Sequence, residues 1–163
     1  MRLLAALLLF FPAPAWAAQL LFAGGQWVAL DRGATCEAAS RSIRIAPKDK
    51  VQARAGLAFD GPGPRRGQFF AQLSRVPRTG STVILTVGDQ PFLLVSRGDW
   101  AWSRGSEQEA AIQTAIRSAG GMRIQARNQA GGRFTDRYLL DGAPTAIDAA
   151  AARCALRGAG KVR

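Results

Sequence analysis

The sequence has no histidine, only two cysteines and only three lysines among its 163 residues. The absence of histidine removes the commonest general base and the commonest metal ligand. Two cysteines alone are too few ligands for a zinc site. Lys48, Lys50 and Lys161 lie in a Pro-rich stretch and in the C-terminal tail, where the desolvated amine of a Ser-Lys pair is not expected. We therefore predict no catalytic residues, no metal and no cofactor.

Nucleotide-binding motifs are also missing. No Walker or dinucleotide-binding glycine motif occurs. The glycine-rich stretch GPGPRRG, residues 61–67, contains prolines that remove the amides a phosphate cradle needs. The aspartates are scattered at predicted turns and strand edges, so no pair of carboxylates stands out as a glycosidase site. An undetected hydrolase remains the enzymatic alternative.

Long apolar runs are absent except at the N-terminus. Leu3 to Phe11 is unbroken and apolar, Arg2 precedes it, and small residues surround Trp16. This layout predicts a secretory signal peptide over residues 1–17, with a buried N-terminal element as the alternative. No later run approaches the ~20 apolar residues of a membrane helix. We expect the mature chain, from Ala18, to be periplasmic or secreted, without a transmembrane segment.

Acidic residues are half as frequent as basic ones: 11 against 22, a net charge of +11. A basic exported protein is suited to lipopolysaccharide, anionic lipid, acidic polysaccharide or nucleic acid. The arginines are spread along the whole chain, which an Arg-rich compositional bias would also produce. No specific nucleic-acid motif is predicted.

The two cysteines, Cys36 and Cys154, are an even number in a chain expected to reach an oxidising compartment. They predict one disulfide between the start of the domain and its last helix, and two buried free thiols are the alternative. In the chain-entropy model, closing so long a loop stabilises the fold by roughly 4–5 kcal/mol, less any strain.

Most of the remaining chain shows strand patterns. Strands are predicted for QWVALD, QFFAQLSRV, TVILTVG, FLLVSR, WAWS, MRIQARN and RFTDRYLL, joined by Gly-rich turns. The segment around Cys36 is predicted to be irregular, and residues 46–67 to be a long mobile loop. The fold class is mainly β: an antiparallel sandwich or open barrel with two short helices, in one domain over residues 18–157. Residues 158–163 are predicted to be a disordered tail.

Two segments show helical patterns. Ser106 and Glu109 have the spacing of a capping box, and the next residues place apolar side chains on one face. A last helix is predicted from Pro144, with Asp148 in a capping position and an alanine-rich surface that lets it lie close to a sheet.

The stretch RGDWAWSR combines a cell-adhesion tripeptide with two tryptophans. Gly98-Asp99 between apolar runs is a strong hairpin signal, so we interpret the tripeptide as a turn, with an adhesive site as the alternative. Trp100 and Trp102 share one strand face, which is predicted to be core. If exposed, they form a candidate partner-binding surface with Arg97, Asp99 and Arg104.

A candidate basic face lies on two predicted neighbouring strands near the C-terminus. The outward residues of these strands include Arg123, Arg127, Arg133 and Arg137. Arg65 and Arg66 would add to the same polyanion-binding function. This function predicts an affinity that falls steeply with salt.

The second half of the chain resembles a known family. The stretches GSTVILTVGDQPFLLV and MRIQARNQAGGRFTDRYLLDGAPTAIDAAAARC, with the capped helix between them, resemble the invasion-associated locus B family of proteobacteria over residues 80–154. Family members typically hold a pair of cysteines around the middle hairpin, which is absent here. The resemblance implies an exported, β-rich, non-enzymatic envelope protein, linked in some bacteria to host-cell entry.

The function predicted from sequence is therefore binding of an envelope or host macromolecule by an exported, non-enzymatic protein. Electrostatic binding of lipopolysaccharide or acidic polysaccharide is the second hypothesis, and hydrolysis is the third.

Overall fold

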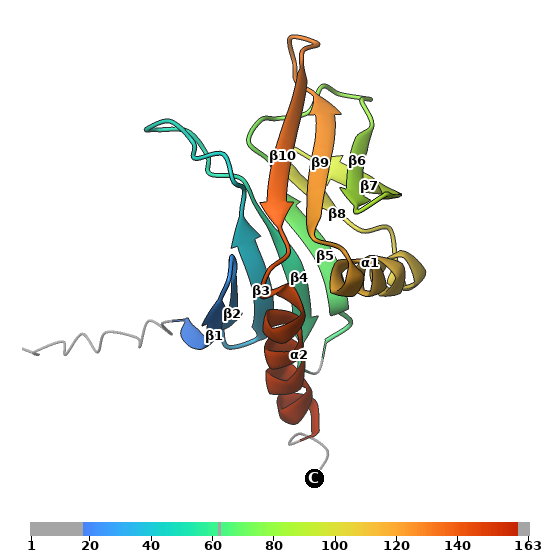
Figure 1. Cartoon of the computed structure of the whole chain (residues 1–163). Helices are drawn as coiled ribbons and strands as arrows, with labels where there is room; N and C mark the ends of the chain where they lie inside the picture. Colours follow the sequence, from blue (N-terminus) through green and yellow to red (C-terminus); the bar gives the residue numbers. More distant parts are fainter. Residues whose placement is uncertain (1–17, 62, 160–163) are drawn as a thin grey trace, which may run out of the picture.

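The computed structural model describes residues 18–61 and 63–159 and consists mainly of antiparallel strands (Figure 1). The predicted signal peptide, residues 1–17, lies outside the described residues. The ten strands form one sheet in the order β1-β2-β3-β4-β5-β8-β7-β6-β9-β10. The strands are β1 (Gln19–Gly24), β2 (Trp27–Asp31), β3 (Thr35–Arg41), β4 (Arg54–Asp60), β5 (Arg66–Gln72), β6 (Val83–Val87), β7 (Gln90–Arg97), β8 (Trp100–Trp102), β9 (Gly121–Arg127) and β10 (Arg133–Leu139). With helices α1 (Ser106–Ser118) and α2 (Ala143–Ala159), they confirm the predicted mainly β fold.

The sheet curls until its two edges approach each other. Strand β7 joins the two halves, because its first residues pair with β6 and its last residues pair with β8. Near the edges, the amide of Gln26 donates to the carbonyl of Asp141 at 3.0 Å. The indole N–H of Trp27 donates to the carbonyl of Leu139 at 2.9 Å. One continuous curled sheet corresponds to the open-barrel alternative, not to a sandwich of two separate sheets.

The two helices cover the curled sheet and contact each other. Helix α1 packs on β5, β6 and β7, and α2 packs on β1 to β4. The alanine-rich face of α2 is buried, as predicted, through Ala143, Ala146 and Ala150. Short side chains let the helix approach the sheet closely, and removal of apolar area from water stabilises the contact by ~25 cal/mol per Å². The largest fully buried side chains include Trp27, Tyr138 and Phe69.

The sequence predicted best those strands in which buried and exposed residues alternate. In β9, Met122 and Ile124 are buried while Arg123 and Arg127 are exposed. In β2, Trp27 and Ala29 are buried, as the alternation of this strand requires. One polar face and one buried face produce this pattern, and it specifies the register of the strand.

Three strands differ from the predictions. Strand β1 was not predicted, β3 lies where an irregular segment was expected, and β4 lies inside the predicted loop of residues 46–67. Five consecutive residues of β4, from Ala55 to Phe59, are buried, so the strand has no alternation to detect. Gly56 also suggested a loop, yet a Cβ at this position would lie 2.1 Å from the carbonyl oxygen of Ala38. Glycine is required here because β3 passes so close.

The helix ends also differ in detail from the predictions. The capping box is wrong: Gly105 is the N-cap of α1, and no side chain caps the helix. The carboxylate of Glu109 instead accepts a hydrogen bond from the hydroxyl of Ser103 at 3.2 Å. Asp148 lies inside α2, not at its cap, and pairs with Arg117 of α1. Helix α2 continues to Ala159, so residues 158 and 159 of the predicted tail are helical, and residues 160–163 lie outside the described part.

Candidate functional site

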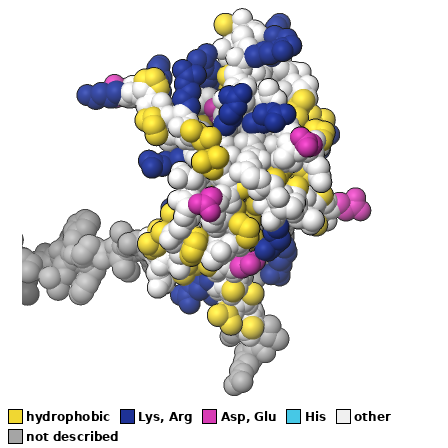
Figure 2. Space-filling model, viewed as in Figure 1, with side chains coloured by type: hydrophobic (Ala, Val, Ile, Leu, Met, Phe, Trp, Pro, Cys, Tyr) yellow, Lys and Arg dark blue, Asp and Glu magenta, His cyan; other side chains and the backbone are white. Residues whose placement is uncertain are grey.

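A cleft of about 590 Å³ separates strand β10 from an arm formed by residues 42–53, which connects β3 to β4. The arm extends away from the body of the molecule (Figure 1). One acidic residue, Asp136, lines the cleft. The cationic residues that line it are Arg44, Lys50, Arg75, Arg133 and Arg137. Figure 2 shows basic side chains gathered over this part of the molecule, with hydrophobic side chains of the arm between them.

The cations of the cleft carry their charge without local neutralisation. Within residues 18–61 and 63–159, no carboxylate oxygen lies within 4.0 Å of the charged groups of these five residues. All five side chains are exposed at the surface. Like charges held close together raise the local concentration of anions. The cleft therefore has a positive electrostatic field that favours negatively charged groups near it.

The predicted basic face on β9 and β10 continues from this cleft. Arg133 lies directly opposite Arg127, and Arg137 lies directly opposite Arg123 in the antiparallel register. All four side chains are exposed, as predicted. Directly opposed like charges destabilise a strand pair. Two of the four, Arg133 and Arg137, also line the cleft, which joins the face and the cleft into one basic surface.

Gln52 holds the arm in a defined shape. Its side-chain oxygen accepts from the amide of Ala46 at 2.9 Å, and its side-chain nitrogen donates to the hydroxyl of Ser42 at 2.9 Å. The base of the arm is fixed to β10, because the amide of Ile43 donates to the carbonyl of Arg137 at 2.8 Å. The arm is thus preorganised beside the cleft by hydrogen bonds to side chains and to the sheet edge.

The arm exposes aliphatic side chains next to the cations. The exposed fractions are 55% for Ile43, 71% for Ile45 and 42% for Val51. Single exposed apolar residues are normal, but three on one arm beside a charged cleft make the arm a candidate interaction surface. Ile45 and Val51 themselves line the cleft, so apolar and cationic groups face the same space.

Asp136 forms the inner wall of the cleft and is almost fully buried. Its carboxylate accepts a hydrogen bond from the amide of Ser74 at 2.9 Å, which ties β10 to the segment that follows β5. Two residues further along, Tyr138 points into the core. Burial raises the pKa of Tyr138, and the charge of Asp136 raises it further, so its hydroxyl is neutral at physiological pH.

The Arg-Gly-Asp stretch forms the tight turn that was predicted. Arg97 and Trp100 are paired residues of β7 and β8, with Gly98 at φ 60° between them. Arg97 is exposed, but the carboxylate of Asp99 accepts a hydrogen bond from the side chain of Gln72 at 3.0 Å. The acidic group of the tripeptide is therefore already engaged by the neighbouring strand.

The prediction that the Trp100 and Trp102 face is core is wrong. Ala101, between them, is the fully buried residue of β8, while both indoles are partly exposed on the opposite face of the sheet. The cation near them is Arg54, 5.2 Å from the ring centroid of Trp100. The sequence alone does not reveal Arg54, because β4 has the local pattern of a loop. The residues that flank the two tryptophans in sequence indicate only Arg97 and Arg104.

Arg65 does not contribute a free charge to the predicted polyanion surface. Its guanidinium lies 2.7 Å from the carboxylate of Asp60. Burial has the largest single effect on the pKa of Asp60 and raises it, but the hydrogen bonds and charge of Arg65, together with the hydrogen bond from Thr35, lower this pKa below its ordinary value. Arg66 is exposed and donates to the carbonyl of Gly61 at 3.5 Å.

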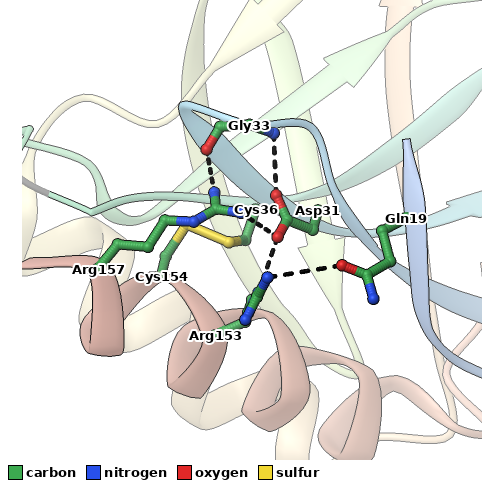
Figure 3. Close-up of polar contacts among 7 residues, drawn as sticks. All are labelled: Gln19, Asp31, Gly33, Cys36, Arg153, Cys154 and Arg157. Carbon is green, nitrogen blue, oxygen red and sulfur yellow. Dashed lines mark hydrogen bonds and ion pairs between the residues drawn. A yellow bond between two sulfur atoms is a disulfide. The ribbon is translucent and has the colours of Figure 1, made fainter. Parts of the chain in front are cut away.

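A buried carboxylate connects the N-terminal strands to α2 (Figure 3). Asp31, 3% exposed, accepts hydrogen bonds from Arg153, at 2.8 Å, and from Arg157. The hydrogen bond from Arg157 has the largest effect on the pKa of Asp31 and lowers it, whereas burial alone would raise it. The net result is a pKa far below the ordinary range of an aspartate, so the carboxylate stays charged at physiological pH.

The predicted disulfide lies beside this carboxylate (Figure 3). Cys36 of β3 and Cys154 of α2 are bonded, with 5.8 Å between their Cα atoms. The two residues are 118 positions apart in sequence. The covalent bond and the Asp31 ion pairs together hold α2 on the sheet, a structural role rather than a binding role.

The described residues contain no group of three or more His, Cys, Asp or Glu side chains arranged to hold a metal ion. Neither of the two described helices is long and apolar enough to cross a bilayer.

Comparisons with known proteins returned no match: no family model, no curated protein and no solved structure is similar to this chain.

Proposed function

We propose that the protein is an exported, non-enzymatic envelope protein, and that its cleft binds an anionic lipid that carries phosphate groups, the class to which lipopolysaccharide belongs. The observation that carries the proposal is the cleft itself. It is lined by five cations, two on the arm and three on the body of the molecule, and by the exposed aliphatic side chains of Ile45 and Val51, with Ile43 exposed on the same arm. Export is supported by the signal-peptide pattern of residues 1–17 and by a disulfide, which forms and persists in oxidising compartments.

The charges of the cleft favour phosphate as the recognised group. Four of the five cations are arginines, whose planar guanidinium groups match phosphate oxygens in bidentate geometry. The opposed arginines of β9 and β10 destabilise the free protein. A bound polyanion relieves that repulsion, so a ligand with several negative charges should bind with the most favourable free energy.

The exposed side chains of Ile43, Ile45 and Val51 favour a lipid over a polysaccharide. An acidic polysaccharide has charge but no apolar chain to cover them. An anionic lipid satisfies both features, because its headgroup meets the cations while its acyl chains meet the arm. Cationic side chains near an anionic lipid surface contribute about 1 kcal/mol each.

Two other functions predicted from the sequence receive less support. A role in host-cell invasion, with the partner surface of the invasion-associated locus B family, rests on the sequence pattern alone. For hydrolysis of a sugar, two carboxylates at one site are the usual requirement, and Asp136 is the one acidic residue that lines the cleft. Binding through the cleft is therefore the function that we propose.

The test is a binding measurement with vesicles of phosphatidylcholine alone, vesicles that also contain phosphatidylglycerol, lipopolysaccharide, and alginate as an acidic polysaccharide. We compare the parent protein with Arg133→Gln/Arg137→Gln and with Ile43→Ser/Ile45→Ser. The matched control is Arg97→Gln/Arg104→Gln, which removes the same charge from exposed residues that do not line the cleft.

We expect binding to the anionic lipids and not to phosphatidylcholine. The cleft variant should lose roughly 10- to 30-fold in affinity, from about 1 kcal/mol for each arginine removed. The arm variant should also bind lipid more weakly, and the control should bind like the parent. Equal losses in the cleft and control variants would mean a general charge effect and overturn the proposal. Tighter binding of alginate, unaffected by the arm variant, would reassign the cleft to polysaccharide.

A further inference from the structure

A second pocket lies on the opposite face of the sheet from the core, over β4, β5 and β8. Strand alternation creates it: Phe69 and Ala101 point into the core, while Phe70, Trp100 and Trp102 point outward. The pocket has a volume of about 360 Å³. No residue of this pocket lines the cationic cleft.

The aromatic rings form a defined surface. The indoles of Trp100 and Trp102 are nearly parallel, with 12° between their planes and 6.4 Å between their centroids. The ring of Phe70 lies 6.3 Å from that of Trp100 and is itself mostly buried. The two indoles remain partly exposed, so they keep apolar surface available to a ligand.

Polar side chains around these rings are held in place by the strands. The guanidinium of Arg54 lies over Phe70, at 5.6 Å, and over Trp100, at 5.2 Å. It also lies 3.9 Å from the carboxylate of Glu37. A guanidinium that stacks on aromatic rings and faces a carboxylate has few conformations left to lose when a ligand binds.

The cations of this pocket are paired, unlike those of the cleft. The two cations that line it are Arg54 and Arg65, and each lies within 4.0 Å of a carboxylate, from Glu37 and Asp60 respectively. Glu37 also pairs with Arg32, at 2.8 Å. Paired cations attract a polyanion less strongly than the unpaired cations of the cleft do. The pocket offers aromatic surface, amide and guanidinium donors, and the carboxylate of Glu37 as an acceptor.

We propose that this pocket binds one or two rings of a neutral glycan. The C–H face of a pyranose ring is apolar and packs on an aromatic ring, while its hydroxyl groups both donate and accept hydrogen bonds. The pocket has this combination, with indoles for the ring face and the side chains of Gln68, Arg54 and Glu37 for the hydroxyls. A pocket of this volume holds a small ligand rather than a protein surface.

The experiment titrates the full chain with neutral trisaccharides of glucose, of mannose and of N-acetylglucosamine, and follows tryptophan fluorescence and calorimetric heat. The variants are Trp100→Ala, Trp102→Ala and Trp102→Phe, the last of which keeps an aromatic ring. The matched control is Leu93→Ala, an exposed apolar side chain on β7 that lies outside the pocket. Circular dichroism and urea denaturation establish that each variant folds.

We expect at least one trisaccharide to bind, and each Trp→Ala variant to lose about tenfold or more in affinity. Each substitution removes the apolar ring face on which the pyranose ring packs. Trp102→Phe should keep part of the affinity, and Leu93→Ala should keep all of it. Binding should persist at about 1 M salt, where the Debye length is near 3 Å.

Three results would overturn this proposal. They are no binding to any of the three trisaccharides, binding unchanged by both Trp→Ala variants, and binding lost in high salt or in Arg133→Gln/Arg137→Gln. The last result would place the sugar in the cationic cleft. Success or failure here leaves the lipid proposal untouched, because the two sites share no lining residue.

Discussion

Arg123 and Arg137 lie directly opposite each other on neighbouring antiparallel strands, with both side chains exposed. Arg127 and Arg133 repeat the arrangement further along the same pair of strands. Opposed like charges at these positions reduce the stability of the pair. These two pairs therefore do not stabilise the fold, which is consistent with the binding role that we propose for the cleft.

Removal of one opposed arginine should stabilise the fold. We expect Arg123→Gln to raise the free energy of unfolding by about 0.2–1 kcal/mol at low salt, because it relieves the repulsion with Arg137. The gain should shrink at high salt, where surface charges are screened. Urea denaturation at two salt concentrations measures both effects. Arg97→Gln is the control, since Arg97 lies opposite Trp100 and has no such repulsion to lose. An equal gain in the control would contradict the explanation.

The buried carboxylate of Asp31 should make stability depend on acid pH. Its pKa is lowered in the folded state, so the folded protein binds the proton less readily than the unfolded chain does. The stabilisation is complete above the unfolded pKa of about 3.9 and is lost as the pH falls below that value. Asp31→Asn should lower the free energy of unfolding at neutral pH by roughly 2 kcal/mol and weaken the pH dependence.

The control for Asp31 is another Asp–Arg pair that joins two elements. Asp148 pairs with Arg117, but both side chains are largely exposed, 63% and 45% respectively. Exposed pairs contribute little, so Asp148→Asn should change stability by less than about 1 kcal/mol. Urea denaturation of both variants between pH 3 and pH 7 compares them directly. If Asp148→Asn destabilises more than Asp31→Asn, burial does not decide the strength of these pairs.

The disulfide should contribute a large part of the stability. We expect Cys36→Ala/Cys154→Ala to lower the free energy of unfolding by about 2–5 kcal/mol, because the bond closes a long loop of the unfolded chain. The cysteines are fully buried, and alanine creates no unpaired polar group there. Urea denaturation compares the double variant with the oxidised and reduced parent. A midpoint that is the same in all three samples would show that the noncovalent contacts of α2 suffice.

The Arg-Gly-Asp turn should not support cell adhesion. The carboxylate of Asp99 already accepts a hydrogen bond from Gln72, and the turn around it is only two residues long. We expect animal cells to adhere equally to surfaces coated with the parent protein and with Asp99→Glu. A selective loss of adhesion in a correctly folded Asp99→Glu variant would establish the adhesive alternative.

The sequence predicted elements well where local pattern and tertiary environment agree. The alternation of β9 follows from one buried and one exposed face, and the arginines at positions 123 and 127 were correctly placed on the exposed face. The cysteine pair was predicted from an even count and an expected oxidising compartment, and two cysteines allow one pairing. Strand β4 was missed because its residues are buried on both faces and it contains Gly56, so its local signal is that of a loop.

The sequence by itself determined the mainly β class, the outward arginines of β9 and β10 and the Cys36–Cys154 pair, because each depends on a short-range period or on a simple count. Only the tertiary structure decided the two candidate sites. The cleft combines the arm, the segment after β5 and β10, and the aromatic pocket combines β3, β4, β5 and β8. The strand order and the curl of the sheet bring these distant segments together. Neither can be predicted from the residue pattern of one strand, because both depend on contacts between segments far apart in sequence.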